Sequence, residues 1–547
     1  MIVGKEMKHS KQFKVSNRIP CKREAVVQLE GSTSFTGSPI AVVDIGCTFL
    51  RLIIAEKRKD GTCAILEQVV QSVPIGKDIL SFKEISQDTL EHCVTILHDF
   101  HRLLSEYRIK AETVHAVAIA VLRQAENCDV FIDRLTIASG ISFQVLEIGQ
   151  TAYYYHLALR MIPKNKGLLE NDSIAVLEIG GLTCSLLYRY QGEIQYAQTY
   201  NVGALRIRQQ LESLRLGNRH LLDIVEGRIR EMSENLKQNI KSKKTKFIFL
   251  GRVLRFAIPH LHTTGDVNVE ASRIVWIQVS KVEALIKDVK GQSVAECASC
   301  WKIPYAEAEL IAPTLMLVLL MAKALKCKAL FIGNLSSSDG LVIEAADNPE
   351  REALMLRHII RIARETGEKY GCDVKHAEMV MENAVSIFDI LKKEHVCTPK
   401  HRMMLQVAAL LHDIGMFINA RGHHKHSNYL IRNTEFIGLS QDDITIIALI
   451  ARYHRKSPPR LTHPEFASLT REQRLIVCKL AAILRVADAL DRIHDQNLGK
   501  LTFKLMEREL RCIPSRGVHV HAEQIALGEK GDLFKLMYGR CCVIKGV

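Results

Sequence analysis

The chain has 547 residues, of which 47% are hydrophobic and 24% are charged, and its net charge is +14. This length exceeds what a single hydrophobic core supports, so we expect two to four domains in a folded rather than a disordered protein. The beginning of the chain has no apolar segment of the kind found in secretion signals. The longest apolar run, 310–325, contains Pro313 and Lys323, and we predict a buried core helix there and no membrane partner.

The cysteines indicate the redox compartment of the protein, and the basic clusters indicate the kind of partner that it binds. The 15 cysteines form no regular framework, which favours reduced thiols in a cytoplasmic protein. Basic residues gather in the first 24 residues and again at 237–246. Such charge favours an anionic partner such as polyphosphate or a highly charged nucleotide, although each cluster also fits a solvated segment. No base-reading motif stands out, so we predict no specific nucleic acid.

Residues 1–37 lack apolar periodicity and are predicted to be a basic, flexible tail. The segment AVVDIGCTFLRLIIAE (41–56) that follows predicts a strand, a glycine turn and a second strand. The segment IAVLEIGGLTCSLLYRY (174–190) repeats this design. Asp44 and Glu178 occupy the same place in the two units, each directly before Ile-Gly. The repeat predicts two related α/β lobes that face one cleft.

A glycine turn between two strands lets backbone N–H groups approach phosphate oxygens closely. An acid at the end of the first strand can hold Mg²⁺ or orient a water beside that phosphate. One such hairpin is weak evidence, whereas two of them indicate a pair of lobes that clamp a phosphate chain. Asp44 and Glu178 are therefore candidate catalytic residues.

Helical periodicity replaces the strand pattern after about residue 348. Within this region His376, the adjacent pair His412 and Asp413, and Asp488 form an ordered H…HD…D set. An adjacent His and Asp can serve one binuclear metal site, and a distant His and Asp can complete it. Such a site, holding Mg²⁺ or Mn²⁺, would produce hydroxide for attack on a phosphate ester. From about residue 501 the pattern alternates again, which predicts a small terminal cap.

Two blocks rich in histidine and basic residues lie between these metal-ligand candidates. They are candidates for anion binding or for additional metal ligands: His423, Lys425, His426, Arg452, His454, Arg455 and Lys456. A single histidine is more often structural, but the group as a whole points to function.

These motifs together resemble those of the exopolyphosphatase/guanosine pentaphosphate phosphohydrolase (Ppx/GppA) family, followed by a histidine–aspartate (HD) domain. The resemblance covers about residues 40 to 540. It implies an α/β actin-like fold of the sugar kinase–actin superfamily, an all-α HD domain and an α+β cap. The implied bounds are 38–160 for the first lobe, 161–347 for the second, 348–496 for the HD domain and 497–547 for the cap. It also implies a homodimer.

By this resemblance, the two loops and a further segment, AVAIAVLRQAENCDVFIDRL (116–135), bind the phosphate chain. The implied phosphate ligands are Gly46, Cys47, Thr48, Arg51, Arg123, Gly180, Gly181 and Thr183. The implied substrate is inorganic polyphosphate or a guanosine polyphosphate, since both present the same terminal phosphoanhydride.

The chain also departs from the family pattern at the catalytic base. The family carries two adjacent glutamates shortly before the second loop, and the second of them is the base. Gln150 and Thr151 stand in their place here, and neither accepts a proton from water at neutral pH. Glu147, four residues before Thr151, is the candidate substitute base. The HD ligands, by contrast, are all present.

Three functions therefore stay open on the sequence. The first is a phosphoanhydride hydrolase of the family type, acting in the cleft between the lobes. The second is a metal-dependent HD-domain phosphohydrolase whose front half senses polyphosphate or a nucleotide. The third is a non-enzymatic adaptor that binds an anion without turning it over.

Overall fold

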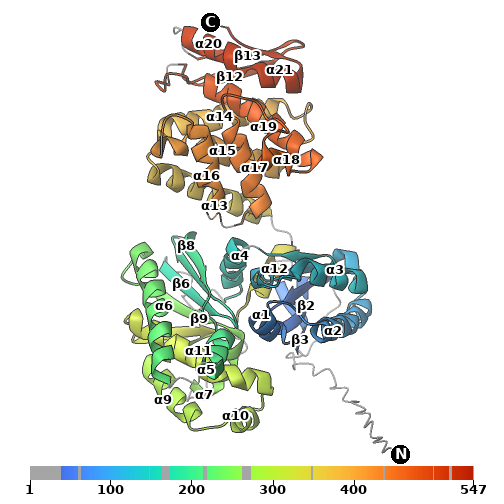
Figure 1. The fold of residues 1–547 in the computed structure, drawn as a ribbon, viewed down its shortest axis with the longest axis vertical. Helices are drawn as coiled ribbons and strands as arrows, with labels where there is room; N and C mark the ends of the chain where they lie inside the picture. Colours follow the sequence, from blue (N-terminus) through green and yellow to red (C-terminus); the bar gives the residue numbers. More distant parts are fainter. Residues whose placement is uncertain are drawn as a thin grey trace, which may run out of the picture.

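The structure is a computed structural model, and it describes residues 39–545 apart from 59–62, Glu147, 163–172, 214–217, 262–272, 347–348, Glu435, Ile437, Asn497 and 516–519. The predicted basic tail and Glu147 lie outside the described residues. Figure 1 shows two α/β lobes side by side, with helices α13 to α19 stacked beyond them and a small sheet at the far end of the long axis.

The first lobe is built on a five-stranded sheet in the order β3-β2-β1-β4-β5. Its strands are β1 (Pro39–Ile45), β2 (Phe49–Lys57), β3 (Cys63–Ser72), β4 (His115–Ala118) and β5 (Phe143–Val145). Its helices are α1 (Ile75–Phe82), α2 (Gln87–Glu106), η1 (Ala111–Thr113), η2 (Ala120–Gln124), α3 (Cys128–Ser139), α4 (Ile148–Ala158) and η3 (Leu159–Met161). Strands β1, β2 and β3 pair antiparallel, whereas β4 runs parallel to β1 and β5 runs parallel to β4.

The second lobe repeats this plan in a six-stranded sheet of order β10-β11-β9-β6-β7-β8. Its strands are β6 (Ser173–Ile179), β7 (Cys184–Tyr190), β8 (Glu193–Tyr200), β9 (Lys246–Leu250), β10 (Ile274–Gln278) and β11 (Ala329–Gly333). Its helices are α5 (Ala204–Ser213), α6 (Asn218–Asn239), α7 (Arg252–Leu261), α9 (Val279–Lys290), α10 (Val294–Trp301) and α11 (Tyr305–Ala324). Strands β6, β7 and β8 pair antiparallel and β9 runs parallel to β6, so the predicted repeat of the two strand-turn-strand units is confirmed.

One helix departs from the expected domain bounds, and another is buried although its length and composition would allow a membrane span. Helix α12 (Ser337–Ala345) falls within the range expected for the second lobe, but it packs against α4 and β1 of the first. Helix α11 is long and apolar enough to cross a membrane, yet most of its residues are buried against α5, α6, α7, α9 and α10. Its burial inside the protein agrees with the core helix predicted at 310–325.

Residues after α12 form a helical region and a terminal sheet. The helices are α13 (Pro349–Lys369), α14 (Val374–Ile390), α15 (Pro399–Leu411), η5 (Ile414–Phe417), α16 (His423–Arg432), α17 (Gln441–Arg452), α18 (Pro464–Ala467) and α19 (Arg471–Ala489). The C-terminal elements are β12 (Leu501–Leu505), β13 (Glu509–Pro514), α20 (His521–Lys530), α21 (Asp532–Tyr538) and β14 (Cys541–Ile544), with sheet order β12-β13-β14.

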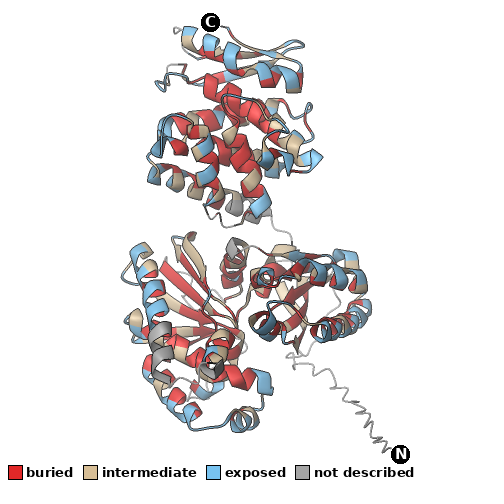
Figure 2. Ribbon diagram, in the orientation of Figure 1, coloured by how far each residue is buried: buried red, intermediate tan, exposed pale blue. Residues whose placement is uncertain are grey.

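Burial separates the front lobes from the helical region. Apolar residues of both lobes form two cores, one of them around α4 and α12, and residues of the helical region and the terminal sheet share a third. Figure 2 shows the strands of the front sheets and the inner helices of the helical region as buried, with exposed residues on the outer helices. Helix α19 runs through the centre of the third core, which is why Leu480 to Leu484 and Val486 are fully buried.

Candidate functional site

The two glycine turns have the same local geometry. The Gly46 N–H donates to the carbonyl of Phe49 at 2.8 Å, and the Gly180 N–H donates to the carbonyl of Thr183 at 2.9 Å. The turns also approach each other closely. A Cβ added at Gly181 would lie 2.9 Å from Cys47 Sγ, so glycine is the residue that lets the second turn lie against the first.

A cavity of about 190 Å³ lies between these turns. All the turn residues that the sequence indicated line it: Asp44, Gly46, Cys47, Thr48, Arg51, Glu178, Gly180, Gly181 and Thr183. We call it the front cavity. The structure thus brings together two segments more than a hundred residues apart in the sequence, and it places both predicted acids in one wall.

Asp44 is buried, and one of its carboxylate oxygens accepts a hydrogen bond of 2.5 Å from Ser338 Oγ. Its other oxygen, Oδ1, has no hydrogen-bond partner among the described residues. Burial raises the pKa of Asp44, while Arg51 opposite it on β2 and the Ser338 hydroxyl act in the other direction. The free oxygen is an acceptor that a cation or a water could use.

Glu178 occupies the corresponding place at the end of β6. Burial, opposed by a hydrogen bond from Tyr155 and assisted by the nearby Asp44 charge, raises the pKa of Glu178 from 4.5 to about 8. A carboxyl group with a pKa near 8 can exchange a proton with water close to neutral pH.

The cationic side of the front cavity differs from the prediction. Arg123 lies in η2 and donates to the carbonyl of Val145 at 3.0 Å, and it is Gln124 that lines the cavity. The structure therefore does not bring Arg123 to the site. Arg252, at the start of α7, lines the cavity instead, and Glu307 holds one edge of its guanidinium group. No motif in the segment LGRVLRFA (250–257) marked Arg252 as a site residue.

The structure also places the two residues that the resemblance aligns with the family's glutamates. Thr151, which the resemblance aligns with the catalytic base, lines the front cavity. Its neighbour Gln150 is not among the lining residues. The position is thus oriented as the resemblance implies, but the side chain there is a hydroxyl.

A second cluster, the metal cluster, gathers His376, His412, Asp413, His423, His454 and Asp488 in the helical region. Ligand atoms of His376, His412 and Asp488 lie within 4.8 Å of one another, and so do those of Asp413, His423 and His454. All four predicted metal ligands are therefore brought together. His423 and His454, which were predicted to bind an anion, also belong to this cluster.

The hydrogen bonds of the four histidines fix how their rings are used. Each Nδ1 lies beside an oxygen: Asp491 Oδ2 at 2.8 Å for His376, the Ala409 carbonyl at 2.7 Å for His412, the Ala420 carbonyl at 3.0 Å for His423 and the Ala451 carbonyl at 2.7 Å for His454. Since a carbonyl only accepts, the proton sits on Nδ1 and the Nε2 lone pair faces the cluster. Arg455 Nη1, a permanent donor, lies 3.2 Å from Nε2 of His423, which agrees with this tautomer.

These lone pairs face one another at short distances. Nε2 of His376 is 3.3 Å from Nε2 of His412, and the same distance separates the Nε2 atoms of His423 and His454. Burial lowers the pKa of His454 to about 3, so this ring is neutral at physiological pH. Neutral nitrogens converging in pairs, with carboxylates beside them, are the donor set of a cation site.

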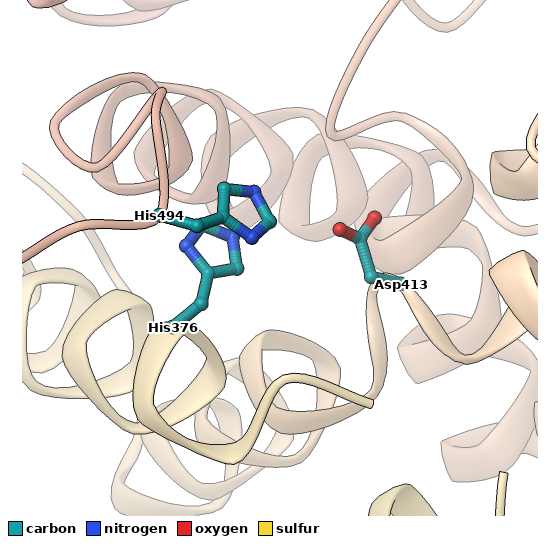
Figure 3. A group of neighbouring side chains, drawn as sticks. All are labelled: His376, Asp413 and His494. Atoms are coloured by element: carbon teal, nitrogen blue, oxygen red, sulfur yellow. The ribbon is translucent and has the colours of Figure 1, made fainter. Parts of the chain in front are cut away.

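The carboxylates of the cluster are ionised. Burial alone would raise the pKa of Asp413, but His412 and the contact with His423, whose Nε2 lies 3.1 Å from Asp413 Oδ1, hold it well below its usual range. Asp488 is held low in the same way, chiefly by Lys530, whose ammonium group contacts Asp488 Oδ2 from helix α20. Figure 3 shows Asp413 facing His376, and His494 stacked on the His376 ring with centroids 3.5 Å apart.

The remaining predicted anion ligands are dispersed. Arg452 pairs with Glu465, and the carbonyl of Lys456 accepts a hydrogen bond from Arg485. Only Arg455 reaches the cluster, through His423. Neither Lys425 nor His426 belongs to the cluster of ligand atoms among the described residues.

Comparison with known proteins agrees with the two-part organisation. Residues 35–348 match the Ppx/GppA phosphatase family, and residues 360–513 match domain III of Ppx/GppA phosphatases. A guanosine-5'-triphosphate,3'-diphosphate pyrophosphatase from Vibrio parahaemolyticus is 21% identical over 452 residues, which span 82% of this chain and 87% of the relative. One from Pseudoalteromonas atlantica is 22% identical over 492 residues, spanning 87% and 91%.

A solved structure shows the same fold in the front part. The exopolyphosphatase from Cytophaga hutchinsonii superimposes with a TM-score of 0.50 at 17% identity, covering 56% of this chain and 98% of that protein. At this identity the likeness establishes the actin-like fold of the two lobes and nothing about the reaction.

Proposed function

The chain belongs to the Ppx/GppA phosphatase family, and from this premise we propose that it is a phosphoanhydride hydrolase acting in the front cavity. The substrate class is inorganic polyphosphate or a guanosine polyphosphate, and the product is the terminal phosphate. The relatives named as guanosine-5'-triphosphate,3'-diphosphate pyrophosphatases support this class, since they match most of the chain.

One observation carries the proposal: both turns, with Asp44 and Glu178 beside them, line a single cavity. Backbone N–H groups of glycine turns suit phosphate oxygens because no side chain blocks the approach. Arg51 and Arg252 add positive charge from β2 and from the start of α7. Together these groups would bind and orient a terminal phosphate, which is the main requirement for phosphoryl transfer to water.

A divalent cation fits the same wall. Asp44 has a buried oxygen without a partner, Glu178 lies nearby, and oxygen ligands are what Mg²⁺ prefers. Mg²⁺ or Mn²⁺ held at Asp44 would neutralise charge on the phosphate oxygens, and Glu178 would stay available for the proton.

The proton from the attacking water needs an acceptor, and Thr151 cannot serve. We assign that role to Glu178, because its pKa of about 8 leaves the carboxylate basic enough to take a proton near neutral pH. Tyr155, which donates to Glu178, holds the carboxyl group in place. Glu178, at the end of β6, would then take the role that the resemblance gives to a glutamate at the position of Thr151.

Phosphate release from long-chain polyphosphate and from pppGpp, with Mg²⁺ present, tests this assignment. The variant Glu178→Gln keeps the shape of the side chain and removes the base, so we expect phosphate release to fall by about a hundredfold or more. Glu234→Gln on α6 removes the same charge from an exposed site and should leave the rate unchanged. Full activity of Glu178→Gln would rule out this residue as the base.

A second function is favoured by the metal cluster, whose four histidines direct Nε2 lone pairs inward. We propose as the alternative that this cluster holds Mn²⁺ or a similar cation and hydrolyses a phosphate ester, while the front half binds a polyphosphorylated regulator. Imidazole and carboxylate donors suit such ions, and the metal would supply hydroxide near neutral pH. In that case the cluster residues, with Asp491 orienting His376, would fix the ion and its water.

The variant Asp413→Ala separates the alternatives. It removes a carboxylate that three histidines surround, so Mn²⁺-dependent hydrolysis should vanish if the cluster is catalytic. Binding of polyphosphate without turnover in wild-type protein, under either metal, would instead support the adaptor function.

A further inference from the structure

A second, smaller cavity of about 130 Å³ adjoins the front cavity, and the proposed reaction does not use it. Its lining includes the guanidinium groups of Arg51, Arg252, Arg255 and Arg273, with Asp339 as the acid among the lining residues. We call it the arginine cavity. It shares Arg51, Arg252 and Ser336 with the front cavity, so the two spaces meet at a common wall.

The carboxylates around the arginine cavity are already engaged. Arg273 Nη1 holds Asp339 Oδ1 at 2.9 Å, and Asp339 Oδ2 also accepts a hydrogen bond from Ser336 Oγ at 2.7 Å. Asp44 faces Arg51 from the neighbouring strand, and Glu307 holds Arg252. Asp339 and Glu307 each bind one edge of a guanidinium group, whereas Arg51 Nη1 donates to the hydroxyls of Ser336 and Ser338.

Two other guanidinium donors are buried. Arg51 is only 5% exposed, yet its Nε has no hydrogen-bond partner, and neither has Nη1 of Arg252, among the described residues. A buried charged donor without a partner costs free energy that a bound acceptor would recover. Burial lowers the pKa of Arg51, the Asp44 carboxylate raises it, and the like charge of Arg252 lowers it again.

The backbone adds a third source of attraction. Gly251 and Arg252 line both cavities, and helix α7 begins at Arg252 and runs for ten residues. The free N–H groups and the positive end of a helix dipole favour an anion at this position. A Cβ at Gly251 would lie 2.7 Å from the carbonyl of Ile179, so the helix start is held close to the end of β6.

We propose that the arginine cavity is a second phosphoryl-binding site, separated from Asp44 and Glu178 by the wall that Arg51 and Arg252 form. Planar guanidinium groups pair with phosphate oxygens through two parallel hydrogen bonds, and four of them around one small space select a compact, highly charged oxyanion. The group is either free orthophosphate or the next phosphoryl group of a chain whose end lies in the front cavity. Binding at this site does not depend on hydrolysis, so the proposal holds even if hydrolysis takes place at the metal cluster.

Binding of orthophosphate and of tripolyphosphate to the full chain, measured by calorimetry in metal-free buffer, tests the site. Arg255 lines only the arginine cavity, so the variant Arg255→Gln leaves the front cavity intact. We expect it to weaken binding by about tenfold or more, the effect of losing one charged hydrogen-bonding group. Arg134→Gln on α3 removes an exposed arginine that lines neither cavity and serves as the charge-matched control.

The two ligands distinguish the two sources of the phosphoryl group. Weaker binding of orthophosphate in Arg255→Gln assigns the site to the free ion, and weaker binding of tripolyphosphate alone assigns it to the substrate chain. Arg255→Lys keeps the positive charge but lacks the two parallel N–H donors of a guanidinium group. Its affinity should therefore fall between those of wild type and Arg255→Gln. Equal affinities of wild type and both Arg255 variants for both ligands, with unchanged melting temperatures, would overturn the proposal.

Discussion

The two acids of the front cavity are equivalent in the repeat but differ in their surroundings. Asp44 lies beside Arg51 and accepts a hydrogen bond from Ser338, whereas Glu178 accepts one from the hydroxyl of Tyr155. Environments that separate two carboxyl groups in this way assign them different roles. Asp44 is suited to hold a cation, and Glu178 is suited to exchange a proton.

The raised pKa of Glu178 makes the stability of the protein depend on pH. Burial raises it from an ordinary 4.5 to about 8, so between these values the folded chain holds a proton that the unfolded chain has lost. Stability therefore falls as pH rises through this window, and the loss is complete above about pH 8. At about 1.4 kcal/mol per unit of pKa, the ceiling is a few kcal/mol.

The variant Glu178→Gln carries no ionisable group and lacks this dependence. Its melting temperature relative to wild type should therefore rise steadily between pH 5 and about pH 8 and then level off. Thermal unfolding of both proteins in metal-free buffer measures the difference. Parallel curves across this range would show that Glu178 is ionised in the folded chain.

Restoring a carboxylate at Thr151 is the complementary prediction. Thr151 lines the front cavity, so Thr151→Glu would place a carboxyl group where the family has its base. We expect phosphate release to increase by about tenfold or more, since a positioned general base contributes at least that much. Gln150→Glu, at the neighbouring position outside the lining, is the control and should not change the rate. An unchanged rate in Thr151→Glu would mean that water attacks from another side.

The sequence predicted the site residues whose role is defined by their immediate neighbours, and it missed the residues that long-range packing brings to the site. Asp44, Gly46 and Glu178 were predicted because a strand, a glycine and an acid define the turn within a few residues. Ser338 and Arg252 were not, because Ser338 depends on how α12 packs against β1, and Arg252 on how α7 packs against α11 and β11. The tautomers of His423 and His454 depend on the carbonyls of Ala420 and Ala451, so the sequence could not separate metal ligands from anion ligands.

Among the elements, helix starts near the site follow rules that a sequence reveals in part. Ser336 caps α12 and pairs reciprocally with Asp339, which also positions the serines that contact Arg51. Ser440 caps α17, and Asp443 completes the capping box. Several neighbouring polar residues could each cap this helix, so a single sequence does not fix its first residue.

The contact between the two glycine turns yields a prediction at this scale. Gly181→Ala would place a methyl group 2.9 Å from Cys47 Sγ and 3.3 Å from Thr48 Cγ2, so the turns must separate. We expect a loss of about 1–3 kcal/mol in stability, typical of overpacking, together with weaker tripolyphosphate binding. Gly227→Ala in α6 meets nothing within 4 Å and should be neutral or slightly stabilising. Urea unfolding and calorimetry measure both variants, and identical behaviour of the two would contradict the close contact.

On the scale of the whole molecule, the chain carries two candidate catalytic centres, one between the front lobes and one in the helical region, whose hydrophobic cores are separate. The front lobes match the family and bring the two glycine turns together around one cavity. The helical region matches domain III of the family and gathers the six side chains of the metal cluster. The number of parts was predictable from length and periodicity, whereas the core that the terminal sheet shares with the helices depends on long-range packing.

The most direct test of the account is phosphate release from polyphosphate and pppGpp by wild type, Asp44→Asn and Asp413→Ala, each with Mg²⁺ and with Mn²⁺. Asp44→Asn removes a charge from the wall of the front cavity, and Asp413→Ala removes one from the metal cluster. We predict that Asp44→Asn loses activity with both metals and that Asp413→Ala retains it. Retained activity in Asp44→Asn with loss in Asp413→Ala would contradict the front cavity as the site of hydrolysis and transfer the reaction to the metal cluster.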